Sequence, residues 1–209
     1  MLSWRRTYSL AFLCTKETKL REFQFKLLHR RIATNDFLHK IGLKPNESCT
    51  FCGETTENLI HLFWKCKHTW IFWEETHRWI CQNVNGLASD TFSVALCLGI
   101  VDDRGDLLLH HVLLIARYYI YTCRLRNTLP KLQIYTKKIL SSMEIERQIA
   151  KDHNTLNAFK KKWTRLKSTP EKINSTPLWN TPSLRGNRVC TCWPVCVSVC
   201  SVGAYWTTL

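Results

Sequence analysis

Hydrophobic residues recur at helical spacing along most of this chain. Between residues 15 and 32, two apolar rows lie side by side, one through Leu20, Phe23 and Leu27 and the other through Phe25, Leu28 and Ile32. Residues three and four apart share one face of a helix, so this pattern predicts an amphipathic helix with Thr15 as its N-cap. Thr34 or Asn35 is then expected to cap a short helix that Gly42 ends. Thr55 or Thr56 is expected to cap another, which carries Leu59, Ile60 and Phe63.

Four further helices are predicted downstream. Their apolar rows are Trp70-Trp73-His77-Ile80, Leu109 to Cys123, Leu132-Tyr135-Ile139-Met143, and Leu156-Phe159-Trp163-Leu166. On the second of these helices, four residues are predicted on the face opposite the apolar one: His110, Arg117, Tyr121 and Arg124. Residues 92–100 form a strand or a short helix, and residues 102–106 a loop. After Lys167, the Ser, Thr, Pro and Asn content predicts disorder.

The charge of the chain points to an anionic partner. The 209 residues carry a formal net charge of +14, and residues 124–172 hold 13 Lys or Arg against four Asp or Glu. Phosphates attract such a surface without any sequence readout, so RNA or DNA is the expected partner, through its backbone. The interface is predicted at seven basic residues: Arg30, Arg31, Lys65, Lys67, Lys160, Lys161 and Lys162. No apolar run is long enough to span a membrane, and no small-molecule substrate is indicated.

The cysteines indicate a metal site. Their number, 11, is odd, and their scattered spacing does not suit a disulfide framework, which favours an intracellular chain, nuclear or cytoplasmic. Cys49, Cys52, His61 and Cys66 follow a C-x2-C-x8-H-x4-C pattern, with Gly53 permitting the turn after the first pair. Three thiols and one imidazole can surround one zinc ion and leave no open position, so the site is predicted to be structural.

The Cys and His residues also allow other interpretations. Taken alone, His61 reads as a core histidine, and only the four residues together favour zinc. His68 and His77 are substitute ligands in principle, but His77 belongs to an apolar row and His68 is expected to be exposed. The cysteines of the repeat-like end, Cys190, Cys192, Cys196 and Cys200, are not expected to form a second site.

The predicted fold is therefore mainly α. A small zinc-stapled helical domain at 10–85 is followed by an amphipathic helical hairpin in a basic region at 91–166, and by a disordered low-complexity tail at 167–209. His61 is expected on a helix, and Cys66 where that helix ends or restarts. Five residues turn about 140° on an ideal helix, so both cannot share one face of it.

The order of these features resembles a known family. The features shared are an apolar helix with a Thr-containing turn, the pair Cys49-Thr-Phe-Cys52-Gly, Glu57 before His61-Leu-Phe-Trp-Lys-Cys66, and a downstream Trp73. Their order is similar to that in the zinc-binding region that follows the polymerase in LINE-type (non-LTR) retrotransposon reverse transcriptases. The resemblance covers roughly residues 10–166. It implies a zinc module that helps such a protein hold RNA or target DNA, with Cys49, Cys52, His61 and Cys66 as ligands.

No catalytic centre is apparent in the sequence. Asp102-Asp103 is the only Asp pair, and Ile100 stands where a polymerase needs Tyr. The function expected is non-catalytic, zinc-dependent binding of nucleic acid. Two alternatives stay open: a protein-interaction zinc module, which usually holds two zinc ions, and a decayed retroelement fragment without a cellular role.

Overall fold

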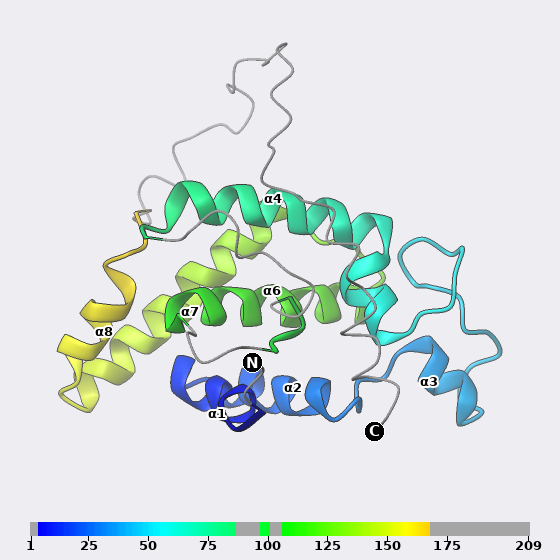
Figure 1. Cartoon of the computed structure of the whole chain (residues 1–209), viewed down its shortest axis with the longest axis horizontal. Helices are drawn as coiled ribbons and strands as arrows, with labels where there is room; N and C mark the ends of the chain where they lie inside the picture. Colours follow the sequence, from blue (N-terminus) through cyan, green and yellow to red (C-terminus); the bar gives the residue numbers. More distant parts are fainter. Residues whose placement is uncertain (1–3, 87–96, 101–105, 168–209) are drawn as a thin grey trace, which may run out of the picture.

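The computed structural model describes residues 4–86, 97–100 and 106–167, and the regular elements in these ranges are helices (Figure 1). They are α1 (Trp4–Cys14), α2 (Thr18–Leu28), α3 (Asn35–Lys40), the π-helix η1 (His61–Lys65), α4 (Lys67–Asn83), α6 (Leu107–Leu125), α7 (Leu132–Asp152) and α8 (Leu156–Trp163). The predicted mainly α fold is confirmed. Most of the predicted segment at 92–100, most of the loop at 102–106 and the tail from residue 168 lie outside the described residues.

Helix α6 is the centre of the fold. It contacts α1, α2, α7 and α8, while α4 packs against α7. In Figure 1, α6 crosses the middle of the molecule with α1 and α2 below it and α4 above, and α7 slants from α4 toward α8. One hydrophobic core joins these helices, from Leu27 of α2 and Trp73 of α4 to Ile120 of α6 and Ile139 of α7. Both predicted helical regions, 10–85 and 91–166, thus contribute to the same core.

The burial of α6 differs from the prediction. His110, Arg117 and Arg124 are buried with the apolar residues of α6 rather than set on an outward face. A helix enclosed by neighbours on several sides has no solvent face, and its polar side chains must find partners inside. Arg117 Nε donates to Oε1 of Gln24, a buried side chain of α2, at 3.1 Å. Neither α6 nor any other described helix is long and apolar enough to cross a membrane.

The helix that contains the first apolar rows is shorter than predicted. It begins at Thr18 rather than after Thr15, whose Oγ1 accepts a hydrogen bond from the N–H of Glu17 instead. It ends at Leu28, because Arg30 takes a left-handed conformation with φ 55°. The first row, Leu20, Phe23 and Leu27, is buried, but Phe25 of the second row is 55% exposed. The predicted cap of α3 is confirmed, since Oγ1 of Thr34 accepts from the N–H of Phe37.

A buried polar cluster fixes α8 to the core. Lys162 Nζ forms an ion pair with Oε2 of Glu146 from α7 at 2.7 Å, and it donates to Nδ1 of His111 from α6 at 2.8 Å. An ammonium group can only donate, so the neutral His111 ring carries its proton on Nε2, toward Ser142 Oγ at 3.1 Å. The side chain of Lys162 is only 13% exposed. Its ammonium group is therefore engaged inside the fold, and its predicted place in a nucleic-acid interface stays a prediction.

Candidate metal centre

The first two ligand positions lie on a tight loop. The N–H of Cys49 donates to the carbonyl of Thr55 at 2.8 Å, and the N–H of Gly53 donates back to the carbonyl of Cys49 at 2.8 Å. Gly53 has φ 73°, a left-handed conformation that only glycine adopts without strain, although its surroundings leave room for a side chain. The conformation, and not the space, is thus the reason for glycine after the second cysteine. The N–H of Phe51 also points at Cys49 Sγ, at 3.4 Å.

The other two ligand positions are joined by a π-turn. The N–H of Cys66 donates to the carbonyl of His61 at 2.8 Å, which is an i to i+5 bond and widens the turn relative to an α-helix. In an α-helix, His61 and Cys66 would point in different directions. The wider π-turn brings residues five apart to the same side, so both side chains can face one metal ion. Asn58 Oδ1 accepts from the N–H of His61 at 2.8 Å, so Asn58, and not Thr55 or Thr56, caps the turn. Cys66 then precedes α4, as predicted.

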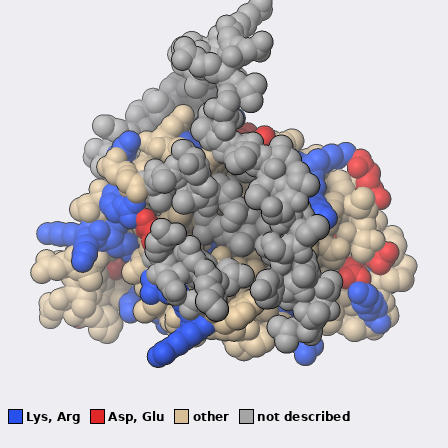
Figure 2. Space-filling view, in the orientation of Figure 1, with Lys and Arg blue, Asp and Glu red and all other residues tan. Residues whose placement is uncertain are grey.

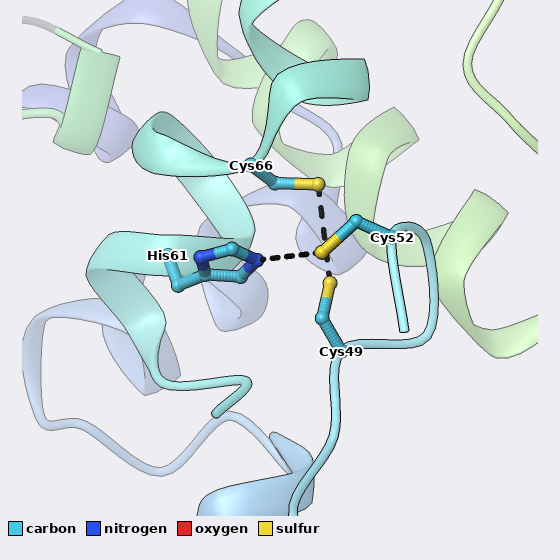
Figure 3. Close-up of side chains that lie close together, drawn as sticks. All are labelled: Cys49, Cys52, His61 and Cys66. Atoms are coloured by element: carbon cyan, nitrogen blue, oxygen red, sulfur yellow. Dashed lines mark hydrogen bonds between the residues drawn. The ribbon is translucent and has the colours of Figure 1, made fainter. Parts of the chain in front are cut away.

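The four side chains converge on one point (Figure 3). Their ligand atoms all lie within 4.8 Å of one another. Cys49 Sγ and Cys66 Sγ are 3.9 Å apart, and Cys52 Sγ is 3.4 Å from Nε2 of His61. Around tetrahedral zinc, two sulfurs lie about 3.8 Å apart and a sulfur and a nitrogen about 3.6 Å apart. The cluster is therefore consistent with one zinc ion and has no position left for a substrate.

Two of the four ligands, Cys66 and His61, have pKa values shifted in the direction that metal binding requires. A hydrogen bond from Cys49 lowers the pKa of Cys66 to about 7, helped by the backbone N–H groups that begin α4. The same bond, with burial, raises the pKa of Cys49. Burial lowers the pKa of His61, which keeps the ring neutral as a ligand must be. Cys66 also occupies the N-cap position of α4, where the helix dipole stabilises a thiolate.

A fully buried ion pair holds the loop from beneath. Glu57 is 0% exposed, and its Oε1 accepts from Nε of Arg124 at 2.9 Å and from the N–H of Asn35 at 3.0 Å. Its Oε2 accepts from the N–H of Thr50, between the two loop cysteines, at 2.7 Å. One carboxylate thus ties the metal loop to the start of α3 and to the end of α6. Nothing in the local sequence around Asn35 or Arg124 marks them for these roles.

Three sets of predicted residues remain: two histidines, six basic residues and the tail cysteines. His68 and His77 do not belong to the four-residue cluster, as expected. His68 is half-buried rather than exposed. Arg30, Arg31, Lys65, Lys67, Lys160 and Lys161 are exposed. They come from separate elements, the α2–α3 turn, η1, α4 and α8, and Figure 1 places α8 at the opposite end of the molecule from α3. The tail cysteines lie outside the described residues.

Comparison with known proteins identifies this region. Residues 6–73 match the family described as zinc-binding in reverse transcriptase, and they include all four ligands. This segment is a zinc-binding domain of the reverse-transcriptase type. The match covers about a third of the chain and describes a zinc-binding region rather than a polymerase. No curated protein and no solved structure matches the chain. That the chain is not an enzyme stays a prediction.

Proposed function

We propose that the chain is a non-catalytic, zinc-dependent module that binds RNA or DNA, and that it is a C-terminal piece of a LINE-type reverse transcriptase protein. The matched family supports the relation to reverse transcriptases, and the resemblance of the longer sequence supports the LINE type. The formal net charge of +14 is the observation that carries the binding function. Phosphates are the ligands that such a surface attracts most strongly.

The zinc ion contributes by fixing basic residues in place. Lys65 and Lys67 flank the ligand Cys66 in the chain and are both exposed. Lys67 forms an ion pair with Glu54 at 2.5 Å, and both side chains are more than half exposed. A solvent-exposed pair of this kind is only weakly held, so a phosphate can displace Glu54. Binding of zinc and binding of nucleic acid are thus coupled through the backbone around Cys66.

Helix α8 supplies a second basic group. Its inward residues, Lys162 and Trp163, both bond to Oε2 of Glu146, at 2.7 and 2.9 Å. With the helix fixed in this way, Lys160 and Lys161 are left exposed on it. Figure 2 shows Lys and Arg side chains gathered at the end of the molecule where Figure 1 places α8. Lys160 and Lys161 are therefore the residues of this segment that we assign to phosphate contacts.

Binding to single-stranded RNA, measured at several salt concentrations, tests the function. The logarithm of the affinity should fall steeply with the logarithm of salt, by about 0.7 per phosphate contact. Replacing Lys160 and Lys161 by Gln should reduce this slope by about 1 to 1.5. Lys40→Gln serves as the control, because Lys40 is exposed, pairs with Asp36 and lies on α3, which Figure 1 places at the other end of the molecule from α8. A flat salt dependence of the unmodified protein contradicts the proposal.

A metal analysis of the same preparation addresses the alternative of a protein-interaction module. We expect one zinc ion per chain, held by the four-residue cluster. Two ions per chain would favour an adaptor of the ring type.

A further inference from the structure

The exposed aromatic residues of the described chain are concentrated on two helices. Trp4, Tyr8 and Phe12 of α1 are 39%, 39% and 57% exposed, and Phe25 of α2 is 55% exposed. In the ranges that the structure describes, the other Trp, Tyr and Phe side chains are buried or half-buried. Single apolar residues on a surface need no explanation, but a group of large rings on adjacent helices indicates a binding site.

These rings form a continuous series. Trp4, Tyr8 and Phe12 are four residues apart, so they form one row about 12 Å long on the outer side of α1. The ring of Tyr8 lies 6.3 Å from that of Trp4 and 5.4 Å from that of His29. The ring of His29 in turn lies 4.2 Å from that of Phe25. We call the series of Trp4, Tyr8, His29 and Phe25 the aromatic strip.

Positive charge accompanies the aromatic strip. Arg5 follows Trp4 in the chain, Lys26 follows Phe25, and Arg31 lies two residues after His29; all three are exposed. The acidic neighbour on this part of α2 is Glu22, which pairs with Lys26 at 2.6 Å on the open surface. Arg21 also places its guanidinium 5.3 Å from the centre of the Phe12 ring. Exposed cations are thus close in sequence to Trp4, Phe25 and His29, and one more lies against Phe12.

We propose that the aromatic strip is a stacking platform for unpaired bases, so that the preferred partner of the chain is a single-stranded nucleic acid. Ring faces accept the faces of any base, while adjacent Arg and Lys residues contact the phosphates of the same strand. The strip has room for about two bases. This inference rests on the proposed function and adds to it the class of nucleic acid. RNA and DNA present the same base faces and phosphates to it.

A strand without bases separates stacking from charge. We compare a single-stranded oligonucleotide with an abasic strand of equal length and equal phosphate number, using both RNA and DNA for the base-bearing arm. The unmodified protein should bind the base-bearing strand about tenfold more tightly. A Tyr8→Leu/Phe25→Leu double variant should lose this preference and keep its affinity for the abasic strand. Ile71→Ala, a similarly exposed apolar position at 53% on α4, should change neither affinity.

The outcomes distinguish the inference from the proposed function. Equal affinity for both strands with a steep salt dependence overturns the aromatic strip as a stacking platform and leaves the phosphate-binding function standing. Unchanged strand preference in the double variant also overturns it. Failure to bind either strand removes the proposed function itself. Self-association in sedimentation that the double variant abolishes makes the strip an interface between copies of the chain and overturns the inference.

Discussion

The carboxylate of Glu57 should be one of the most sensitive groups in the molecule. It is fully buried, it neutralises Arg124, and it accepts three hydrogen bonds within 3.0 Å. Glu57→Gln keeps the size of the side chain but removes the charge and replaces one oxygen by an NH2 group. Either the N–H of Thr50 or the pair of donors from Asn35 and Arg124 then loses its acceptor. Arg124, itself only 6% exposed, is left as a buried charge without a counter-ion.

The expected loss is large relative to the stability of a small domain. Removing one partner of a buried ion pair costs about 3–5 kcal/mol, while whole domains are stable by about 5–15 kcal/mol. A second substitution provides the sharper comparison. Arg124→Met in the Glu57→Gln background removes the orphaned charge, and much of the lost stability should return, because replacing both members of a buried pair is often close to neutral.

Urea unfolding followed by circular dichroism, in the presence of zinc, measures these changes. Glu54→Gln is the matched control, because Glu54 lies on the same metal loop but is 63% exposed in its pair with Lys67. It should change the stability far less than Glu57→Gln does, because solvent screens an exposed ion pair. A Glu57→Gln protein no less stable than the Glu54→Gln protein would refute the reasoning, as would a double variant weaker than the single one.

Three further perturbations have defined outcomes. Chelation of zinc, or Cys52→Ser, should raise amide hydrogen exchange at residues 47–66 while α6 stays protected. Cys81→Ser is the control and should leave this exchange unchanged, because Cys81 is exposed and outside the cluster. Unchanged exchange after chelation argues against a structural metal. Burial and the Lys162 ammonium hold the pKa of His111 well below 6.5, so the unfolded chain binds a proton there that the folded chain excludes. Stability should therefore fall as the pH drops below about 6.5, and it should fall less in a His111→Asn protein. Urea midpoints measured across this pH range test the difference, and the same fall in both proteins would count against this reasoning. Gly99→Ala should cost about 1–3 kcal/mol in urea unfolding, since φ is 80° and the added carbon would lie 2.4 Å from a neighbouring side chain; an unchanged midpoint would show that the backbone there adjusts freely.

The metal ligands could be predicted from the sequence because their spacing is local. Cys49 and Cys52 are separated by one tight turn, and Gly53 indicates the left-handed backbone conformation that this turn needs. The π-turn between His61 and Cys66 could not be predicted. The sequence showed only that two ligands five residues apart do not fall on one face of an α-helix. The structure resolves this conflict with the bond from the N–H of Cys66 to the carbonyl of His61.

The fate of individual charges could not be predicted in this way. Lys160, Lys161 and Lys162 are identical in type and adjacent in the chain, yet the third turns inward to pair with Glu146 from another helix and is only 13% exposed. Burial is decided by what a helix packs against, and this depends on residues far away in the sequence. The same holds in reverse for Phe25, whose apolar character suggested a core position but which lies on the surface.

The ion pair between Glu57 and Arg124 also bears on where the zinc-binding unit ends. The family match stops at residue 73. Arg124, which carries the counter-charge of Glu57, lies at the end of α6, 67 positions after Glu57. A fragment cut after α4 would carry every zinc ligand and still enclose an uncompensated carboxylate, so it should not fold as it does in the whole chain. For the same reason, a lineage that replaced Glu57 by an apolar residue should also have replaced Arg124, and the two positions should change together.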